Sequence, residues 1–150
     1  MVIEKAKLDD AQEILSIQRL AYQDEAKIYD GFPIPPLLET LDELKSKFKT
    51  HLILKATLGG KIVGSVRAAA EDGTCHVARL MVHPDFQSQG IATKLLLEIE
   101  RIFASCGRFE LFTGEKSTKN IRLYVKLGYR VFKVDQPVGN VKLVFLEKMR

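Results

Sequence analysis

The most constraining feature of the sequence is the segment HPDFQSQGIATKLL at residues 83–96, which follows an apolar run and leads directly into helix-forming residues. A helix that begins straight after a tight polar loop presents its first N–H groups unpaired, at the positive end of the helix dipole. Gly90 has no Cβ, so it accepts backbone angles forbidden to other residues and lets a ligand come close. The segment therefore predicts a phosphate-binding turn. The alternative is a glycine-containing loop that binds nothing.

The spacing of this segment differs from two common phosphate-binding motifs. A Walker loop requires GKS or GKT and the dinucleotide fingerprint requires GxGxxG, and neither pattern matches residues 83–96. The helix after the loop is expected from Ile91 to about Ala104, because its apolar residues recur at helical spacing. The phosphate site is therefore expected to be of another kind.

Alternating strand and helix signals surround the segment. Other helices are expected after Asp9 or Asp10, after Thr40, and after Ser117 or Thr118, whereas three prolines predict a loop at residues 29–40. Strands are expected at residues 2–7, 51–57, 61–70, 75–82, 108–114, 129–134 and 141–149. This order indicates an α/β fold with a mixed, mostly antiparallel sheet of about seven strands and about four helices.

Length and composition predict one ordinary domain over residues 1–150. The chain is 46% hydrophobic and 28% charged, which is typical of soluble globular proteins. Its amino terminus carries charges where a signal peptide would be apolar, so a cytoplasmic protein is expected. Cys75 and Cys106 are expected to be reduced thiols, and the scattered histidines indicate no metal site.

Charge is unevenly distributed along the chain. Residues 19–44 contain six acids and two bases, and residues 101–150 contain eleven bases and four acids. Such polarity favours an anionic ligand at one end and a cationic ligand at the other, although scattered solvated charges would look the same.

Two segments carry a resemblance to a known family. Residues 80–96, LMVHPDFQSQGIATKLL, have Gln87, Gly90 and Ala92 at the offsets of the central motif of the GNAT superfamily of N-acetyltransferases, which they resemble. Residues 113–129, TGEKSTKNIRLYVKLGY, are similar to the second motif of that family, through Asn120 and Tyr124. The resemblance extends over the order of strands and helices along the whole chain, which implies a single GNAT-like domain.

The resemblance implies transfer of an acetyl group from acetyl-CoA to a primary amine by direct attack in a ternary complex. Backbone amides near Met81 and Val82 would hold the thioester and its developing oxyanion. Asn120 would contact the pantetheine arm, and Tyr124 would protonate the departing thiolate, unless it is merely a buried aromatic residue. The residues implied to bind the pyrophosphate are Gln87, Ser88, Gln89, Gly90, Ile91 and Ala92.

The general base is left open by the sequence. A primary amine is mostly protonated at neutral pH, so a group must accept its proton before attack. Glu71, near the end of its expected strand, is our candidate, and Glu25, Glu115 and His76 are alternatives. For each of these four residues a structural role is the favoured alternative.

The acceptor wall is expected in residues 21–37, which follow the first helix. Tyr22, Glu25 and Tyr29, with Asp24 and Asp30, would suit a cation through carboxylates and aromatic faces. A small-molecule or peptide amine is therefore the expected acceptor, and an anionic acceptor is not expected. The acids could instead belong to a loop that binds nothing.

Two other classes of protein remain as alternatives. One is a CoA-binding regulatory or interaction domain without turnover, against which Tyr124 argues. The other is a basic nucleic-acid-binding module, but no RNP-type or helix-turn-helix pattern accompanies the bases. Neither nucleic acid nor a membrane is therefore expected as a partner, and a homodimer through the late strands is an open arrangement.

Overall fold

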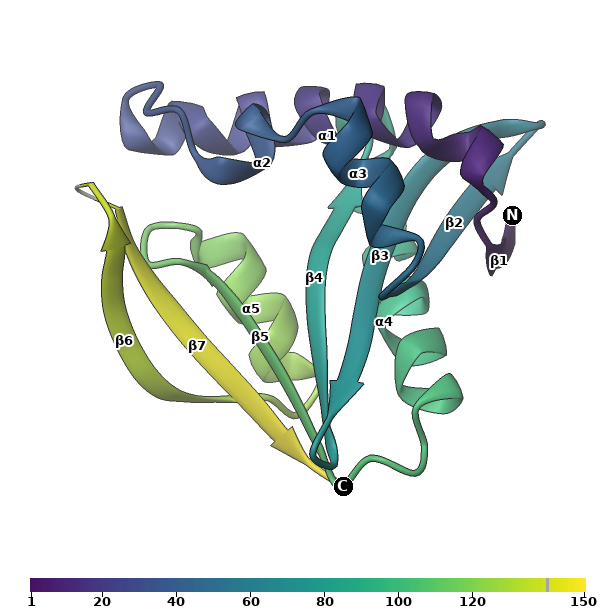
Figure 1. The fold of residues 1–150 in the computed structure, drawn as a ribbon. Coiled ribbons are helices and arrows are strands. Elements are labelled where there is room, and N and C mark those ends of the chain that lie inside the picture. The colour runs from purple at the N-terminus through teal and green to yellow at the C-terminus, as the bar shows by residue number, and fades with distance from the viewer. Residues whose placement is uncertain (140) are drawn as a thin grey trace.

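The computed structural model describes residues 1–139 and 141–150, with the backbone alone at residues 136–138. Within this part of the chain, seven strands form one sheet in the order β1-β2-β3-β4-β5-β7-β6 (Figure 1). The strands are β1 (Val2–Lys5), β2 (Leu52–Leu58), β3 (Lys61–Glu71), β4 (Thr74–Val82), β5 (Arg108–Gly114), β6 (Arg130–Val138) and β7 (Val141–Met149). Neighbours are antiparallel except β4 and β5, so the expected mixed sheet is confirmed.

Helices cover both faces of the sheet. In the described part of the chain they are α1 (Ala11–Ala26), α2 (Pro35–Leu38), α3 (Leu41–Lys47), α4 (Ile91–Ile102) and α5 (Thr118–Lys126). Figure 1 shows α1 crossing the top of the sheet, with α4 and α5 behind it. Successive side chains of β2 point to opposite faces of the sheet. Ile53 packs in a hydrophobic cluster with residues of α1 and α3, and Leu54 packs in another cluster with residues of α4.

The expected loop at residues 29–40 is wrong in part, because it contains α2. Pro35 and Pro36 occupy the first positions of this helix, where a missing N–H breaks no helical hydrogen bond. The count of about four helices therefore becomes five among the described residues. Prolines end a helix when they lie in its interior, but they are compatible with its first turn, which is where Pro35 and Pro36 lie.

The caps of the helices follow the sequence signals unevenly. Thr40 forms the expected capping box with Glu43, since each side chain bonds the other residue's backbone N–H. Asp10 and Ser117 occupy the N-cap positions of α1 and α5, but their side chains make no cap hydrogen bond. The Asp10 carboxylate instead accepts hydrogen bonds from Lys7 N–H and from Lys55 Nζ, both at 2.8–2.9 Å.

The sheet splits between β4 and β5. Their described pairing joins three residue pairs, from Thr74 opposite Arg108 to His76 opposite Glu110, and the strands then diverge (Figure 1). Beyond this point β4 contains a bulge, at which Arg79 has a φ of 53° and the register with β3 shifts. A bulge bends and twists its strand. Beyond His76 and Glu110, no backbone pairing between β4 and β5 is present among the described residues.

No helix in the described residues is both long and apolar enough to cross a membrane. The same residues contain no group of three or more His, Cys, Asp or Glu side chains that could hold a metal ion.

Candidate active site

Two cavities lie where β4 and β5 diverge. The first, of about 470 Å³, is bounded by the end of β4, the start of α4 and α5. The second, of about 380 Å³, is bounded by β4, β5, β7 and the segment 22–36. Both volumes are in the range of small-molecule sites. The cavities meet at the residues that line both, which are Tyr22, Glu25, Leu80, Asn120 and Tyr124.

The end of β4 presents backbone groups to the first cavity. The N–H of His83 donates to Val63 O at 2.8 Å, so it points toward β3. Because hydrogen-bonding directions alternate along a strand, the N–H of Val82 points to the opposite edge, which β5 has left open. Met81 lies opposite Ser65 in the β3–β4 ladder, and both Met81 and Val82 line the cavity.

The loop before α4 supplies further donors to the same cavity. Gly90 has a φ of 80° and Ser88 a φ of 62°, and the first helical hydrogen bond runs from Lys94 N–H to Gly90 O. The N–H groups of residues 91–93 precede that bond, so they are the orphan donors of the helix. The cavity is lined here by Gln87, Ser88, Gly90, Ile91, Ala92 and Thr93. Gln89 belongs to the same exposed loop but is outside the cavity lining.

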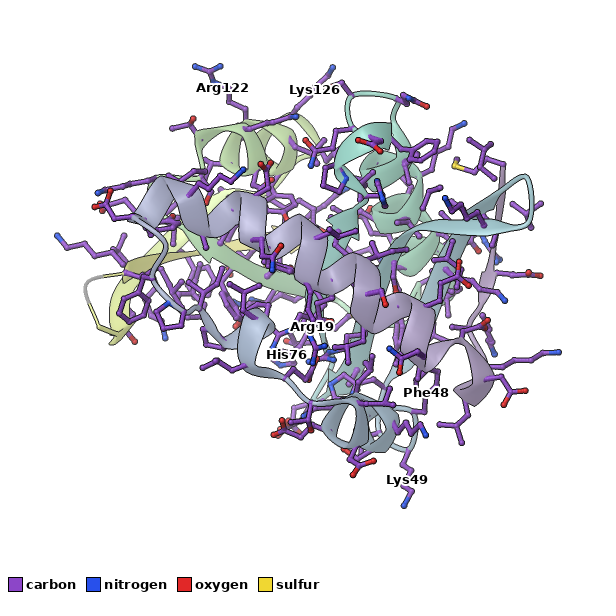
Figure 2. The ribbon with its side chains drawn as sticks, turned by 90° about the horizontal axis from the view of Figure 1, so that it is seen from above. Arg19, Phe48, Lys49, His76, Arg122 and Lys126 are labelled. Carbon is purple, nitrogen blue, oxygen red and sulfur yellow. The ribbon has the colours of Figure 1, made fainter. Side chains whose placement is uncertain are left out.

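Basic side chains surround the first cavity on its α5 side. Lys119 Nζ donates to Gln87 Oε1 at 3.3 Å, which connects α5 to the loop before α4. Figure 2 shows Arg122 and Lys126 projecting outward from α5, on the side of the molecule away from Lys49. With Lys116 these residues line the cavity, against the two acids Asp24 and Glu25. The positive carboxyl-terminal third therefore brings part of its charge to this cavity.

Helix α5 places Asn120 and Tyr124 at the junction of the cavities. They are one helical turn apart and share one face. Asn120 Nδ2 donates to Thr113 Oγ1 of β5 at 3.3 Å, which fixes the amide. Tyr124 is 5% exposed, and burial, with smaller contributions from the charges of Tyr22 and Glu25, raises the pKa of its phenol above 10. The Tyr124 hydroxyl therefore stays protonated at neutral pH.

A hydrogen-bond network closes the other side of the junction. The Ser117 hydroxyl donates to Glu25 Oε1 and lies 3.1 Å from the hydroxyl of Tyr29. Tyr29, in the short 3-10 helix η2 (Lys27–Tyr29), also accepts a hydrogen bond from Lys116 N–H at 3.1 Å. This network explains why Ser117 does not cap α5, and it fixes Glu25 beside both cavities.

The expected acceptor residues lie together in the second cavity. Tyr22, Glu25 and Tyr29 all line it. Burial raises the pKa of Tyr22 to about 12, although the nearby charge of Arg79 opposes the shift. Asp24 lines only the first cavity, and Asp30 is exposed and lines neither.

The candidate bases are separated by the fold. Glu71 is exposed and lies opposite Thr74, next to the β3–β4 turn, and it lines neither cavity. Along β4, Thr74 is three positions from Val77 of the second cavity, roughly 10 Å of extended chain, and seven positions from Met81 of the first cavity, roughly 23 Å. His76 is exposed beside Glu110, Glu115 is also exposed, and neither lines a cavity. Of these four candidates, Glu25 alone reaches the junction.

Sequence reasoning missed several residues of the site. Leu80 and Arg79 line the second cavity because of the β4 bulge, and no local signal in RLMV marks a bulge. Ser117 was assigned to a cap, and Thr93 was not singled out, although it lies one position beyond the predicted loop. The positions of Arg122 and Lys126 at helical spacing from Thr118 could have been found from the sequence.

The matches to known proteins agree with this geometry. A family model described as the acetyltransferase (GNAT) family matches residues 11–129, from the start of α1 to the end of the second motif. The chain belongs to the GNAT acetyltransferase family. The divergent strands, the loop before α4 and the residues of α5 at the junction all lie within the matched GNAT region.

Similar proteins occur in Bacillus subtilis and in Pectobacterium atrosepticum. The YqkA protein of Bacillus subtilis (strain 168) is 28% identical over 120 residues, which are 80% of this chain and 34% of YqkA. An acetyltransferase of Pectobacterium atrosepticum is 35% identical over 89 residues, which are 58% of this chain and 63% of that protein. The match therefore covers less than two thirds of the length of each relative.

A solved structure shares the whole fold. PaiA N-acetyltransferase from Thermoplasma acidophilum, crystallised in complex with coenzyme A, is 18% identical and superposes with a TM-score of 0.80. The comparison covers 100% of both chains. It shows a common arrangement of strands and helices.

Proposed function

We propose that this protein transfers an acetyl group from acetyl-CoA to a primary amine. The observation that carries the proposal is the meeting of two cavities at Tyr124, with helix amides and basic side chains on one side and Glu25 on the other. Membership of the GNAT acetyltransferase family and the coenzyme A bound to PaiA support the same reaction.

The first cavity has the chemistry of a coenzyme A site. The N–H groups of residues 91–93 and the dipole of α4 suit a pyrophosphate, and the cations Lys116, Lys119, Arg122 and Lys126 suit the remaining phosphate charge. Asn120 would bind the pantetheine arm. The open edge of β4 offers the N–H of Val82 to the thioester oxygen, where a preorganised donor is worth roughly 3 kcal/mol to the transition state.

Glu25 and Tyr124 would handle the protons of the reaction. The neutral amine attacks the thioester carbon, so a C–N bond forms and the C–S bond breaks. Glu25 accepts the proton that nitrogen loses, and Tyr124 donates its proton to the departing thiolate and is then reprotonated through solvent. The net change moves one proton from nitrogen to sulfur. Proton transfer from Tyr124 to the thiolate is uphill, because a thiolate is a weaker base than a phenolate. The Tyr124 hydroxyl must therefore be held close to the sulfur.

Calorimetry and a thiol-release assay test the proposal separately. Titration with acetyl-CoA measures binding to the first cavity, and free thiol formed over a panel of primary amines measures turnover. We expect binding and turnover together. Binding without thiol release for any amine would favour a CoA-binding regulatory domain, and no binding at all would contradict both functions.

Replacement of Tyr124 by Phe should lower kcat by roughly 100-fold, because the ring and its packing remain but the proton donor is lost. The dissociation constant for acetyl-CoA should change little. Val125→Ala is the matched control, since Val125 is 52% exposed on the same helix. An unchanged kcat in Tyr124→Phe would show that the hydroxyl takes no part in catalysis.

A further inference from the structure

The second cavity contains a buried cation whose charge is not balanced. Glu39, which lies between α2 and α3, accepts hydrogen bonds from both terminal nitrogens of Arg67 at 3.0 and 3.1 Å, and from Gln18 Nε2 at 2.9 Å. Arg79 Nε lies 3.8 Å from the same carboxylate, which is beyond hydrogen-bond distance. One carboxylate thus faces two guanidinium groups.

Arg67 and Glu39 are buried and Arg79 is partly buried. The side chains of Arg67 and Glu39 are each 7% exposed and that of Arg79 is 16% exposed, and Arg79 Nε has no hydrogen-bond partner among the described residues. Burial of a charge is costly unless the charge is paired. Desolvation lowers the pKa of Arg79, but an arginine stays charged in proteins. The cluster therefore has an excess positive charge, and the Nε groups of both Arg67 and Arg79 are donors without a hydrogen-bond partner among the described residues.

Arg79 is held at the cavity by the backbone. It is the bulge residue of β4, with a φ of 53°, and it lines the second cavity together with Leu80. Among the described residues, Glu25 is the one carboxylate of this lining and Arg79 the one cation, and most of the remaining wall is apolar, including Ile34, Leu111 and Phe145. The wall thus combines a negative group at the junction, a positive group, and apolar surface.

We propose that the acceptor amine also carries a carboxylate, which binds Arg79. The planar guanidinium group matches a carboxylate with two parallel hydrogen bonds. The apolar part of the acceptor then lies against the cavity wall, and its amine points to Glu25 and the junction. This inference rests on the proposed function, and it narrows the acceptor from any primary amine to an amino acid or a similar amino carboxylate with apolar carbons.

The proposal changes an expectation drawn from the sequence. The acids of residues 21–37 made an anionic acceptor unexpected, but of these acids Glu25 alone lines the second cavity. An acceptor with one positive and one negative group complements Glu25 and Arg79 together.

Pairs of acceptors that differ only in the carboxylate test the inference. We would measure kcat/KM for leucine against 3-methylbutylamine and leucinamide, for phenylalanine against phenethylamine, and for 5-aminopentanoate against butylamine. The wild-type protein should favour the carboxylate in at least one pair by roughly 10- to 100-fold, which is the range for a hydrogen bond to a charged group. A wild-type protein that acetylates the plain amines as well or better in every pair would overturn the inference and leave the proposed function intact.

Variants of Arg79 connect the preference to this side chain. Arg79→Met should reduce the preference for the carboxylate to about one, and Arg79→Lys should keep part of it, because the charge remains and the planar fork is lost. Arg101→Met, at an exposed arginine of α4, is the control and should keep the wild-type ratio. A preference that survives in both Arg79 variants would also overturn the inference. Absence of turnover with every amine would contradict the proposed function itself.

Thermal unfolding distinguishes binding from a structural role. Without the Arg79 charge, Arg67 and Glu39 remain as a balanced pair, so the Tm of Arg79→Met should not fall below that of the wild type by more than a few degrees. A large fall in Tm with an unchanged acceptor ratio in Arg79→Lys would mean that Arg79 serves only to stabilise Glu39.

Discussion

At Gly114, the absence of a side chain leaves room for the Tyr29 ring, which lines the proposed acceptor cavity. A Cβ at this position would lie 1.8 Å from the Tyr29 hydroxyl oxygen and 2.5 Å from its Cζ. Gly114→Ala should therefore displace Tyr29 and break its contact with Ser117. We expect a loss of stability of roughly 1–3 kcal/mol from overpacking and a higher KM for the acceptor, measured by thermal unfolding and steady-state kinetics.

Gly107 provides the matched control for this prediction. It directly precedes β5, and a Cβ there would have no atom within 4 Å. Gly107→Ala should leave both the Tm and the KM close to those of the wild type. If Gly114→Ala behaved in the same way, Tyr29 would have no role in shaping the acceptor site.

Single residues of the site were predictable where one short segment determines them. Gly90 follows from the loop before the helix, and Asn120 and Tyr124 from the resemblance of one short segment to a family motif; the structure places all three at the first cavity. The general base could not be chosen among Glu71, Glu25, Glu115 and His76 from the sequence. That choice depends on which elements come together in the fold, and local residue spacing does not specify this. Arg79 was missed because its place in the cavity depends on the bulge.

At the scale of elements, the start of α4 provides the sharpest test of the coenzyme site. Gly90 and Gly60 have φ values of 80° and 79°, and a Cβ on either would have no atom within 4 Å. Alanine at either position should therefore cost a similar 1–2 kcal/mol of stability, from the left-handed backbone alone. Gly90→Ala should in addition weaken acetyl-CoA binding by roughly tenfold, because the methyl group intrudes where a phosphate would approach.

Gly60→Ala separates backbone strain from ligand contact. Gly60 is in the β2–β3 turn, away from both cavities, so its variant should lose stability and keep the wild-type affinity in calorimetry. If Gly90→Ala and Gly60→Ala bound acetyl-CoA with equal affinity, a phosphate site at the loop before α4 would be contradicted.

Most elements could be predicted from the sequence because apolar period and turn residues are local signals. The hairpin around Gly59 and Gly60 and the capping box of Thr40 followed from such signals. Helix α2 was missed, because two adjacent prolines fit a helix start as well as a loop. The parallel neighbour of β4 and the divergence beyond His76 depend on long-range pairing, which the sequence pattern does not specify.

At the scale of the whole molecule, Glu39 connects the stability of the fold to pH. Burial alone would raise the pKa of Glu39, but hydrogen bonds from Arg67 and Gln18 and the nearby positive charges outweigh it and hold the pKa below its ordinary 4.5. A carboxyl group whose pKa is lower in the folded state stabilises the fold above its unfolded pKa, and this contribution is lost as the pH falls through the folded pKa. Acid should therefore weaken this cluster.

Glu39→Gln should destabilise the protein by roughly 3–5 kcal/mol at pH 7, because it leaves buried guanidinium groups without a counter-charge. The difference from the wild type should shrink as the pH falls below about 4.5. Urea unfolding at several pH values measures both effects. Glu98→Gln is the control, since the partner of Glu98, Arg101, is 72% exposed and its loss should matter much less. A difference independent of pH would contradict an ionised Glu39.

The short pairing of β4 with β5 has a consequence for the mechanics of the protein. Three described residue pairs join β4 directly to β5, and thus the two halves of the sheet. A ligand bound between the diverging ends of these strands would contact both halves. Occupancy should then slow amide hydrogen exchange along both facing strand edges at once, including positions that touch no ligand atom. The bound reactants would thus connect β4 and β5 where the two strands do not pair with each other.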